Sequence, residues 1–206
     1  MTKVKLLFDF SKYEELKEVD QQKFEEENKQ LFPEIVKAVT HSFKMLHTVV
    51  LKRIAPVDQD KNLCAVVMSG YLCGYFKKYF PQLCSRATSQ RFKLWVNNTS
   101  VYIKKLDEKT KRPSNIPTDE SMKIFNQLTD NADEKAYNIF FGYTTTDSYS
   151  MITGIYAVCF KGEDLLWFTD LNSFGTESAT PTVPITPLPS APRVKPSVKK
   201  KIEKKE

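Results

Sequence analysis

Hydrophobic positions recur at helical spacing in the first half of the chain. The clearest run has six apolar residues after Pro33: Val36, Val39, Phe43, Leu46, Val50 and Ile54. Apolar residues every three or four positions are typical of an amphipathic helix. Because proline is favoured in the first turn of a helix and disrupts its interior, the pattern predicts a helix that starts at Pro33 and ends before Pro56.

Another helix is predicted from about residue 62 to residue 80, with Asp60 as its N-cap. The segment 62–76 within it is an uncharged run of 15 residues. A membrane span needs about 20 apolar residues, so we interpret this shorter run as a buried helix and expect no membrane role. Gly70 and Gly74 have GxxxG spacing, which predicts close packing of this helix against a neighbouring element.

The N-terminal segment alternates in polarity and then becomes highly charged. Apolar residues at alternate positions between Val4 and Phe10 predict a short strand. Ser11 and Glu14 have the spacing of a capping box, which predicts a solvent-facing helix over 11–30. Six acidic residues should form one face of this helix: Glu14, Glu15, Glu18, Glu25, Glu26 and Glu27.

In the second half of the chain the hydrophobic period changes to two, which is typical of strands. Strands at 91–96 and 100–106 are predicted to form a hairpin around Asn97 and Asn98. A polar loop and a short helix capped by Thr118 follow. Three further strands are predicted to form an antiparallel meander: 136–146, 149–160 and 165–171.

These elements predict an α+β fold, in which N-terminal helices pack against a C-terminal antiparallel sheet made of the hairpin and the meander. Residues 1–174 should form a single globular domain, because all 25 aromatic residues lie there. Residues 175–206 contain six of the eleven prolines and no aromatic residue. We therefore expect a disordered, extended tail, rich in Pro, Ser and Thr, that ends in a lysine-rich segment.

The net charge of +6 is unevenly distributed along the chain. The tail from Thr176 onward carries seven Lys or Arg and three Glu, so it accounts for four of the six net positive charges. The four cysteines form no CxxC pair, and Asp9 interrupts the only apolar run near the N-terminus, so no signal peptide is expected. We expect reduced thiols and a cytoplasmic location, or a virus particle if the source is viral.

The sequence carries none of the familiar motifs for catalysis, metal binding or nucleotide binding. It has only six glycines, and neither GxGxxG nor GxxxxGK[ST] occurs. His41 and His47 lie about 120° apart around their helix, so they cannot easily chelate one ion together. A stretch at Asp58 resembles the start of a calcium loop, but Leu63 occupies the required glycine position. We expect no enzyme, no cofactor, no metal and no small-molecule substrate; the alternative is an unfamiliar active site built from distant residues.

Lysine and aromatic residues alternate on one face of the predicted hairpin. Lys93 and Trp95 share this face with Tyr102 and Lys104 in any register that a tight turn allows. Aromatic platforms beside cations bind single-stranded nucleic acid through base stacking and phosphate contacts. The alternative is cross-strand pairing, in which lysine stems cover the rings of the same chain.

The meander and the tail favour protein contacts. From Ala136 to Phe160 the meander is rich in aromatic residues but has one charge, Asp147, which indicates a core or a protein–protein face. Prolines recur every third residue from Pro181 to Pro187, as in a polyproline II spacer or a ligand for an aromatic groove. Six basic residues of the tail are candidates for binding protein or nucleic acid: Arg193, Lys199, Lys200, Lys201, Lys204 and Lys205.

Together these observations favour a non-enzymatic structural or adaptor protein. It would assemble into a larger complex, such as a virus particle or a similar machine, through an aromatic sheet face and the basic tail. Its partners would be proteins, in a homo-oligomer or a hetero-oligomer. The alternative is an accessory protein that binds nucleic acid through the hairpin face and the lysine-rich tail.

Overall fold

The computed structural model describes residues 14–15, 19–55, 59–85, 92–97, 99–113, 118–129 and 137–174. The strand predicted near the N-terminus and the tail predicted from Gly175 lie outside these residues.

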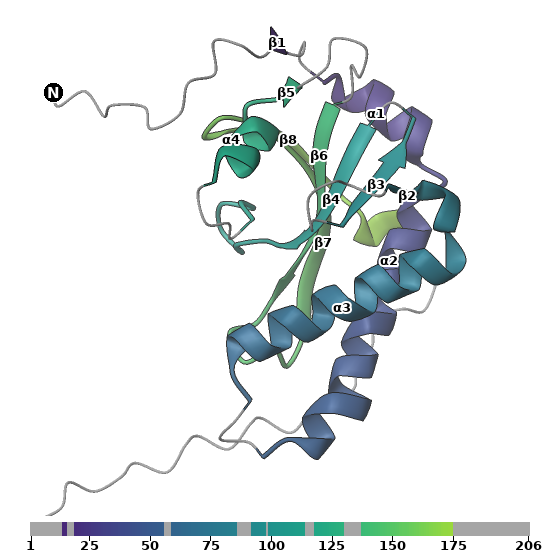
Figure 1. Cartoon of the computed structure of the whole chain (residues 1–206), viewed down its shortest axis with the longest axis vertical. Coiled ribbons are helices and arrows are strands. Elements are labelled where there is room, and N and C mark those ends of the chain that lie inside the picture. The colour runs from purple at the N-terminus through teal and green to yellow at the C-terminus, as the bar shows by residue number, and fades with distance from the viewer. Residues whose placement is uncertain are drawn as a thin grey trace, which may run out of the picture.

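A six-stranded sheet runs through the middle of the molecule (Figure 1). Its strands are, in spatial order, β2 (Cys84–Ser85), β3 (Lys93–Val96), β4 (Thr99–Lys105), β6 (Tyr137–Thr145), β7 (Ile152–Lys161) and β8 (Asp164–Asp170). Every neighbouring pair is antiparallel except β4 and β6, which run parallel.

The α+β fold is confirmed, and both predicted antiparallel units are present. β3 and β4 form the hairpin, with Lys93 opposite Tyr102 and Val96 opposite Thr99. The turn between them contains Asn97, whose φ of 43° lies in the left-handed region that asparagine tolerates. β6, β7 and β8 form the meander, and β7 is its middle strand as predicted.

The expectation that the whole sheet is antiparallel is wrong at one junction. β4 and β6 run parallel because the chain between them crosses back along the sheet before β6 begins. This crossover contains an ordered loop at 106–113 and the helix α4 (Asp119–Phe125). Alternating hydrophobicity cannot show how two antiparallel units will join, since either direction keeps the same residues on each face.

Three longer helices cover one face of the sheet, whereas α4 lies on the other face (Figure 1). They are α1 (Gln21–Asn28), α2 (Phe32–Met45) and α3 (Lys61–Tyr79). The predicted helix starts are confirmed where local caps decide them. Pro33 lies in the first turn of α2, and the Leu63 backbone N–H donates to Asp60 Oδ1 at 2.6 Å ahead of α3. Thr118 caps α4 in a capping box with Ser121.

The charged N-terminal helix is shorter than predicted. Residues Glu14–Glu15 form a short strand, β1, which pairs with β5 (Leu128–Thr129), so the helix predicted from Ser11 is wrong at these positions. α1 begins after Asp20, whose Oδ1 accepts a hydrogen bond from the Lys23 backbone N–H at 2.7 Å. Asp20 is therefore the N-cap residue of this helix, in place of the predicted Ser11.

The sheet separates two hydrophobic cores. The larger core lies between the sheet and α1, α2 and α3, and it contains Phe32, Met68 and Phe141. The smaller core lies on the opposite face and has seven buried members: Tyr102, Leu106, Ile124, Phe125, Phe140, Val158 and Phe160. The aromatic side chains of the meander therefore point into two cores, which accounts for much of the aromatic surplus seen in the sequence.

Candidate interaction surface

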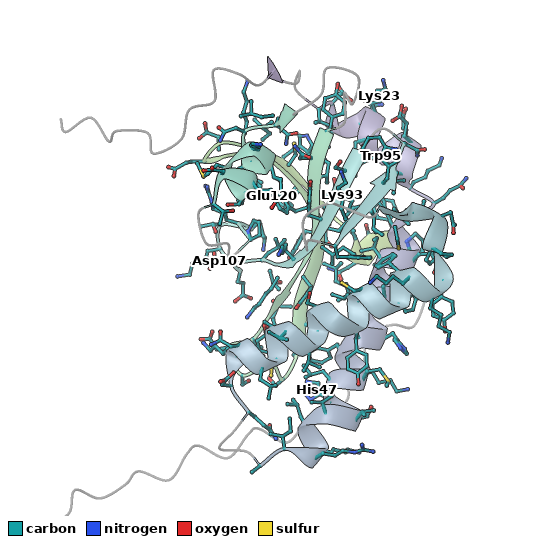
Figure 2. All side chains as sticks on the ribbon, viewed as in Figure 1. Lys23, His47, Lys93, Trp95, Asp107 and Glu120 are labelled. Atoms are coloured by element: carbon teal, nitrogen blue, oxygen red, sulfur yellow. The ribbon has the colours of Figure 1, made fainter. Side chains whose placement is uncertain are left out.

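Three of the four predicted hairpin residues lie on one side of the sheet. Lys93 is opposite Tyr102 across the strands, and Trp95 and Lys104 each follow two residues later in their own strands. Because side chains two residues apart point to the same face, the register places Lys93, Trp95 and Tyr102 on the α4 side. Lys104 lies beyond the last β3–β4 pair, and it also borders the cavity beside α3. Figure 2 shows Lys93 and Trp95 on β3.

Only part of this hairpin face is accessible. Tyr102 is 9% exposed, and its ring centroid lies 5.9 Å from that of Phe140, so it belongs to the smaller core. Trp95 is half-buried, and Lys93 Nζ lies 5.4 Å from the centroid of its ring. This is the arrangement in which a lysine covers an aromatic ring of its own chain. Tyr102 cannot offer its ring to a base in this conformation.

The same kind of contact recurs further along the chain. Lys105 Nζ lies 4.2 Å from the ring centroid of Tyr149, and Lys111 Nζ lies 4.2 Å from that of Tyr156. Contacts of this type contribute about 0.5–1 kcal/mol at exposed positions. Several cations around the hairpin therefore pack on intramolecular aromatic rings.

The loop at 106–113 closes over the smaller core. Asp107 Oδ1 accepts hydrogen bonds from the backbone N–H groups of Lys109 and Thr110, and the bonds from Thr110 hold the pKa of Asp107 below its usual value. The Arg112 guanidinium lies 4.8 Å from the ring centroid of Phe125 and donates to the carbonyl oxygens of Gly162 and Glu163. This loop and α4 thus cover much of the second face of the meander.

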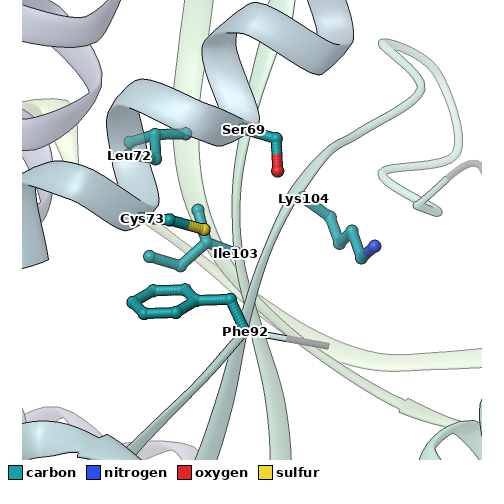
Figure 3. A pocket seen from close by; sticks show the side chains of 6 residues that line it. All are labelled: Ser69, Leu72, Cys73, Phe92, Ile103 and Lys104. Carbon is teal, nitrogen blue, oxygen red and sulfur yellow. The ribbon is translucent and has the colours of Figure 1, made fainter. Parts of the chain in front are cut away.

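A small cavity lies between α3 and the hairpin (Figure 3). Its volume is about 40 Å³, and six residues line it: Ser69, Leu72, Cys73, Phe92, Ile103 and Lys104. Ligand pockets usually measure about 300–1,000 Å³, so the cavity has room for water but not for an organic substrate. Burial raises the pKa of the Cys73 thiol, which disfavours the nucleophilic thiolate.

A partly buried histidine meets a buried tyrosine where the C-terminal end of α2 approaches the turn between β6 and β7. His47 lies in a π-helical turn (Leu46–Val50) that continues α2, and its Nε2 is 2.7 Å from the Tyr149 carbonyl oxygen. Burial lowers the pKa of His47 and raises the pKa of Tyr149 to about 12. Both rings are therefore neutral near pH 7, which suits a structural contact better than proton transfer.

The sequence analysis also predicts no metal site and no membrane-spanning helix. Within the described ranges, no group of three or more His, Cys, Asp or Glu side chains could hold a metal ion. The four cysteines carry free thiols, as expected, and Cys64 and Cys159 are buried. Where the structure describes the chain, none of its helices is both long and apolar enough to cross a bilayer.

The outward side of α3 is an exposed, uncharged surface that the sequence interpretation missed. The run 62–76 was interpreted as a buried helix; the helix is confirmed, but its burial holds only for the side with Cys64, Met68, Leu72 and Phe76. The opposite side follows one ridge of residues at i, i+4 spacing, hereafter the α3 ridge: Val66, Gly70, Gly74 and Lys78. All four are exposed, and the Val66 side chain is 70% exposed.

The two glycines of the α3 ridge contact no neighbouring element. A Cβ added at Gly70 or Gly74 would meet no atom within 4 Å, so the predicted close packing inside the chain is wrong. Glycine inside a helix costs about 0.5–1 kcal/mol relative to alanine, and no contact among the described residues offsets this cost. The sequence did contain a signal for this surface. Residues 62–76 carry no charge on any side of α3, although only one side of the helix is buried.

The six basic tail residues proposed for binding lie outside the described residues: Arg193, Lys199, Lys200, Lys201, Lys204 and Lys205. Their role stays a prediction from the sequence. Comparison of the chain with family models, with curated proteins and with solved structures found no match.

Proposed function

We propose that the protein is a non-enzymatic assembly protein that binds another protein through the α3 ridge. The observation that carries the proposal is an exposed helix side that has no charged residue from Asn62 to Phe76. A surface helix normally places charged and polar residues on its solvent side. The centres of protein interfaces, in contrast, are depleted in charged residues.

The composition of the α3 ridge supports a protein partner. Val66 exposes most of its side chain, and Gly70 and Gly74 leave the helix backbone open to close approach by another element. The sheet contributes less than the sequence indicated, because α4 and the loop at 106–113 cover Phe140 and Phe160. We therefore place the main contact on α3 instead of on the aromatic sheet face.

A non-enzymatic role is part of the same proposal. The cavity beside α3 is too small for an organic substrate, and burial raises the pKa of the Cys73 thiol that lines it. The basic tail from Thr176 would provide a second, electrostatic contact within the same complex. The proposed place of action is the cytoplasm, or a virus particle if the source is viral.

The test is the native mass of the protein in extracts of its source. We expect the wild-type chain in a complex well above its own 23.8 kDa. Val66→Lys places a charge on the uncharged side of α3 and should release the 23.8 kDa chain. Thr48→Lys is the matched control, because it adds the same charge at an exposed position of the helical turn that continues α2. A wild-type monomer in the extract, or a complex that Val66→Lys leaves intact, would contradict the proposal.

A further inference from the structure

We infer that the exposed side of α2 binds an acidic segment of a partner protein. This side continues along the π-helical turn Leu46–Val50 and the 3-10 turn Leu51–Arg53. The residues exposed between positions 32 and 53 form one stripe, hereafter the α2 stripe: Lys37, His41, Lys44, Thr48, Lys52 and Arg53. The first five recur every three or four residues, so they lie on one side of the helix. The α2 stripe is separate from the α3 ridge, and the inference goes beyond the proposed function.

Every charged residue of the α2 stripe is basic. From Ile35 to Val57 the chain contains four Lys or Arg and no Asp or Glu. On most helix surfaces, acids three or four residues from a lysine balance its charge. On α2, Glu34 does so for Lys37, since its Oε1 lies 2.6 Å from Lys37 Nζ. The positive charge further along the stripe is not balanced by α2 itself.

The neighbouring elements do not balance this charge either. Lys44, Lys52 and Arg53 are exposed, and none of them makes an ion pair with another residue that the structure describes. Acids on neighbouring elements are engaged elsewhere: Asp60 caps α3, and Asp147 pairs with a lysine at the start of that helix. Because surfaces of opposite charge attract each other and fix the orientation of a complex, the α2 stripe fits an anionic partner.

Aromatic side chains extend the α2 stripe onto α3, which packs against α2 (Figure 1). The ring centroid of His41 lies 5.6 Å from that of Tyr75, which lies 4.7 Å from that of Tyr79. Tyr79 is 52% exposed, and Lys78 Nζ lies 4.8 Å from the centroid of its ring. Tyrosine is enriched at protein interfaces, where its ring supplies contact area and its hydroxyl forms hydrogen bonds. These rings therefore favour a protein as the anionic partner.

The spacing of the cations also favours a protein over a nucleic acid. Lys37 and Lys44 are seven residues apart, and Lys44 and Lys52 are eight apart. At about 1.5 Å per residue, successive cations are about 10–12 Å apart along the helix. Acids two helical turns apart in a partner protein match this distance, whereas the phosphates of one DNA strand repeat about every 3.4 Å along the axis. Tyr75 and Tyr79 already contact other side chains, so they offer less ring surface to a stacked base.

The test measures binding of the full chain to two anionic probes that carry equal charge. One is a fluorescent polyglutamate peptide, and the other is a fluorescent oligothymidylate. We expect the peptide to bind more tightly than the oligonucleotide. Binding of the peptide should weaken as salt increases, because the contact is between exposed charges.

Charge substitutions assign the binding to the α2 stripe. Lys44→Glu should raise the dissociation constant of the peptide about fivefold, the effect of losing one exposed ion pair, and Lys44→Gln should raise it less. Thr48→Lys adds a cation to the stripe and should lower the dissociation constant. Lys109→Glu is the matched control, because it reverses an exposed charge in the loop at 106–113, on the opposite side of the sheet, and it should have a much smaller effect.

Melting temperatures show whether each variant keeps its fold. If Lys44→Glu does not fold, Lys44→Gln and Thr48→Lys still provide two opposite shifts. The inference is overturned if the peptide does not bind, or if its binding responds to the control as strongly as to the substitutions in the stripe. Oligothymidylate that binds as tightly as the peptide and responds to the same substitutions would indicate a phosphate-binding surface and would also overturn it. None of these results depends on Val66→Lys, which tests the proposed function.

Discussion

At the scale of single residues, lysine and arginine pack on aromatic rings of the same chain. Lys93 lies over Trp95, Lys111 over Tyr156, and Arg112 over Phe125. In the sequence, the same alternation of cations and aromatic residues is also compatible with a nucleic-acid platform. The structure supports the intramolecular interpretation, because a ring covered by a cation of its own chain is less available to a base.

Tyr102 and Trp95 should therefore differ strongly when truncated. Tyr102→Ala removes a buried ring from the smaller core and should lower the free energy of unfolding by about 3–5 kcal/mol, as for other large aromatic residues. Trp95→Ala removes a half-buried ring and should cost clearly less. Urea denaturation of the two variants measures the difference. Equal losses would show that Tyr102 does not pack as described.

The nucleic-acid alternative has its own measurement. If the hairpin face binds single strands, a fluorescent oligonucleotide should bind with an affinity that falls steeply as salt increases. Trp95→Ala should then weaken binding by about 1–3 kcal/mol, the contribution of one stacked base. We expect that oligonucleotide binding, if any, does not depend on Trp95, because Lys93 Nζ already lies over the Trp95 ring.

His47 should make stability depend on pH. Burial lowers the pKa of the folded-state imidazole below its ordinary value near 6.5, so the unfolded chain takes up this proton at a higher pH than the folded chain. The stability that His47 contributes is present above about pH 6.5 and is lost as the pH falls toward the folded-state pKa. Melting temperatures between pH 5 and 8 should show this loss, and His47→Gln should flatten it. Identical pH profiles for the wild-type protein and His47→Gln would show that His47 does not cause the pH dependence.

At the scale of elements, local signals in the sequence were sufficient where the chemistry is local. Pro33, Asp60 and Thr118 each set a helix start through their own backbone or side chain. Pairings between distant segments were not predictable in the same way. The parallel junction of β4 with β6, and the pairing of β1 with β5, depend on how the chain returns after a long connection.

The candidate surface was missed for a related reason. Uncharged residues on every side of α3 indicated burial, yet the sequence alone does not show how many of those sides other elements cover. The loop at 106–113 was predicted only as a polar loop. Leu106 and Arg112 nevertheless fold it over the smaller core, since both contact residues that lie far along the chain.

Two glycines should respond to alanine in opposite directions. A Cβ at Gly142 would overlap the Leu106 side chain, which is itself 2% exposed, so Gly142→Ala should lower the free energy of unfolding by about 1–3 kcal/mol. A Cβ at Gly70 would meet nothing within 4 Å, so Gly70→Ala should raise the stability of the monomer by about 0.5–1 kcal/mol. Thermal unfolding of the two variants checks both signs.

At the scale of the whole molecule, both faces of the sheet are covered, although Leu165 and Phe168 of the edge strand β8 stay exposed, whereas no described element covers the outward side of α3. The three longer helices cover one face, and α4 with the loop at 106–113 covers the other (Figure 1). The helix α3 buries its inner side in the larger core. The exposed Val66 and the two glycines beside it therefore lie on the outer side of the helical layer. An assembly built through this side would leave both cores of each copy intact.

The tail should act in assembly and not in folding. Truncation after Gly175 removes no aromatic residue, so we expect the melting temperature to stay nearly unchanged while incorporation into the native complex falls. The tail lysines would engage acidic residues of a neighbouring copy, such as Glu26 and Glu27, which are exposed on α1. Each such pair contributes less than about 1 kcal/mol and is screened by salt.

Charge reversal distinguishes this electrostatic contact from the apolar contact of α3. Replacing Lys199, Lys200 and Lys201 with Glu should weaken incorporation at low salt and matter little at high salt, because exposed charges lose their attraction as salt increases. Val66→Lys should weaken it at both, since an apolar contact is not screened. Native mass measured at two salt concentrations compares the variants. A truncated chain with a clearly lower melting temperature would show instead that the tail packs on the domain, and that the boundary at Gly175 is misplaced.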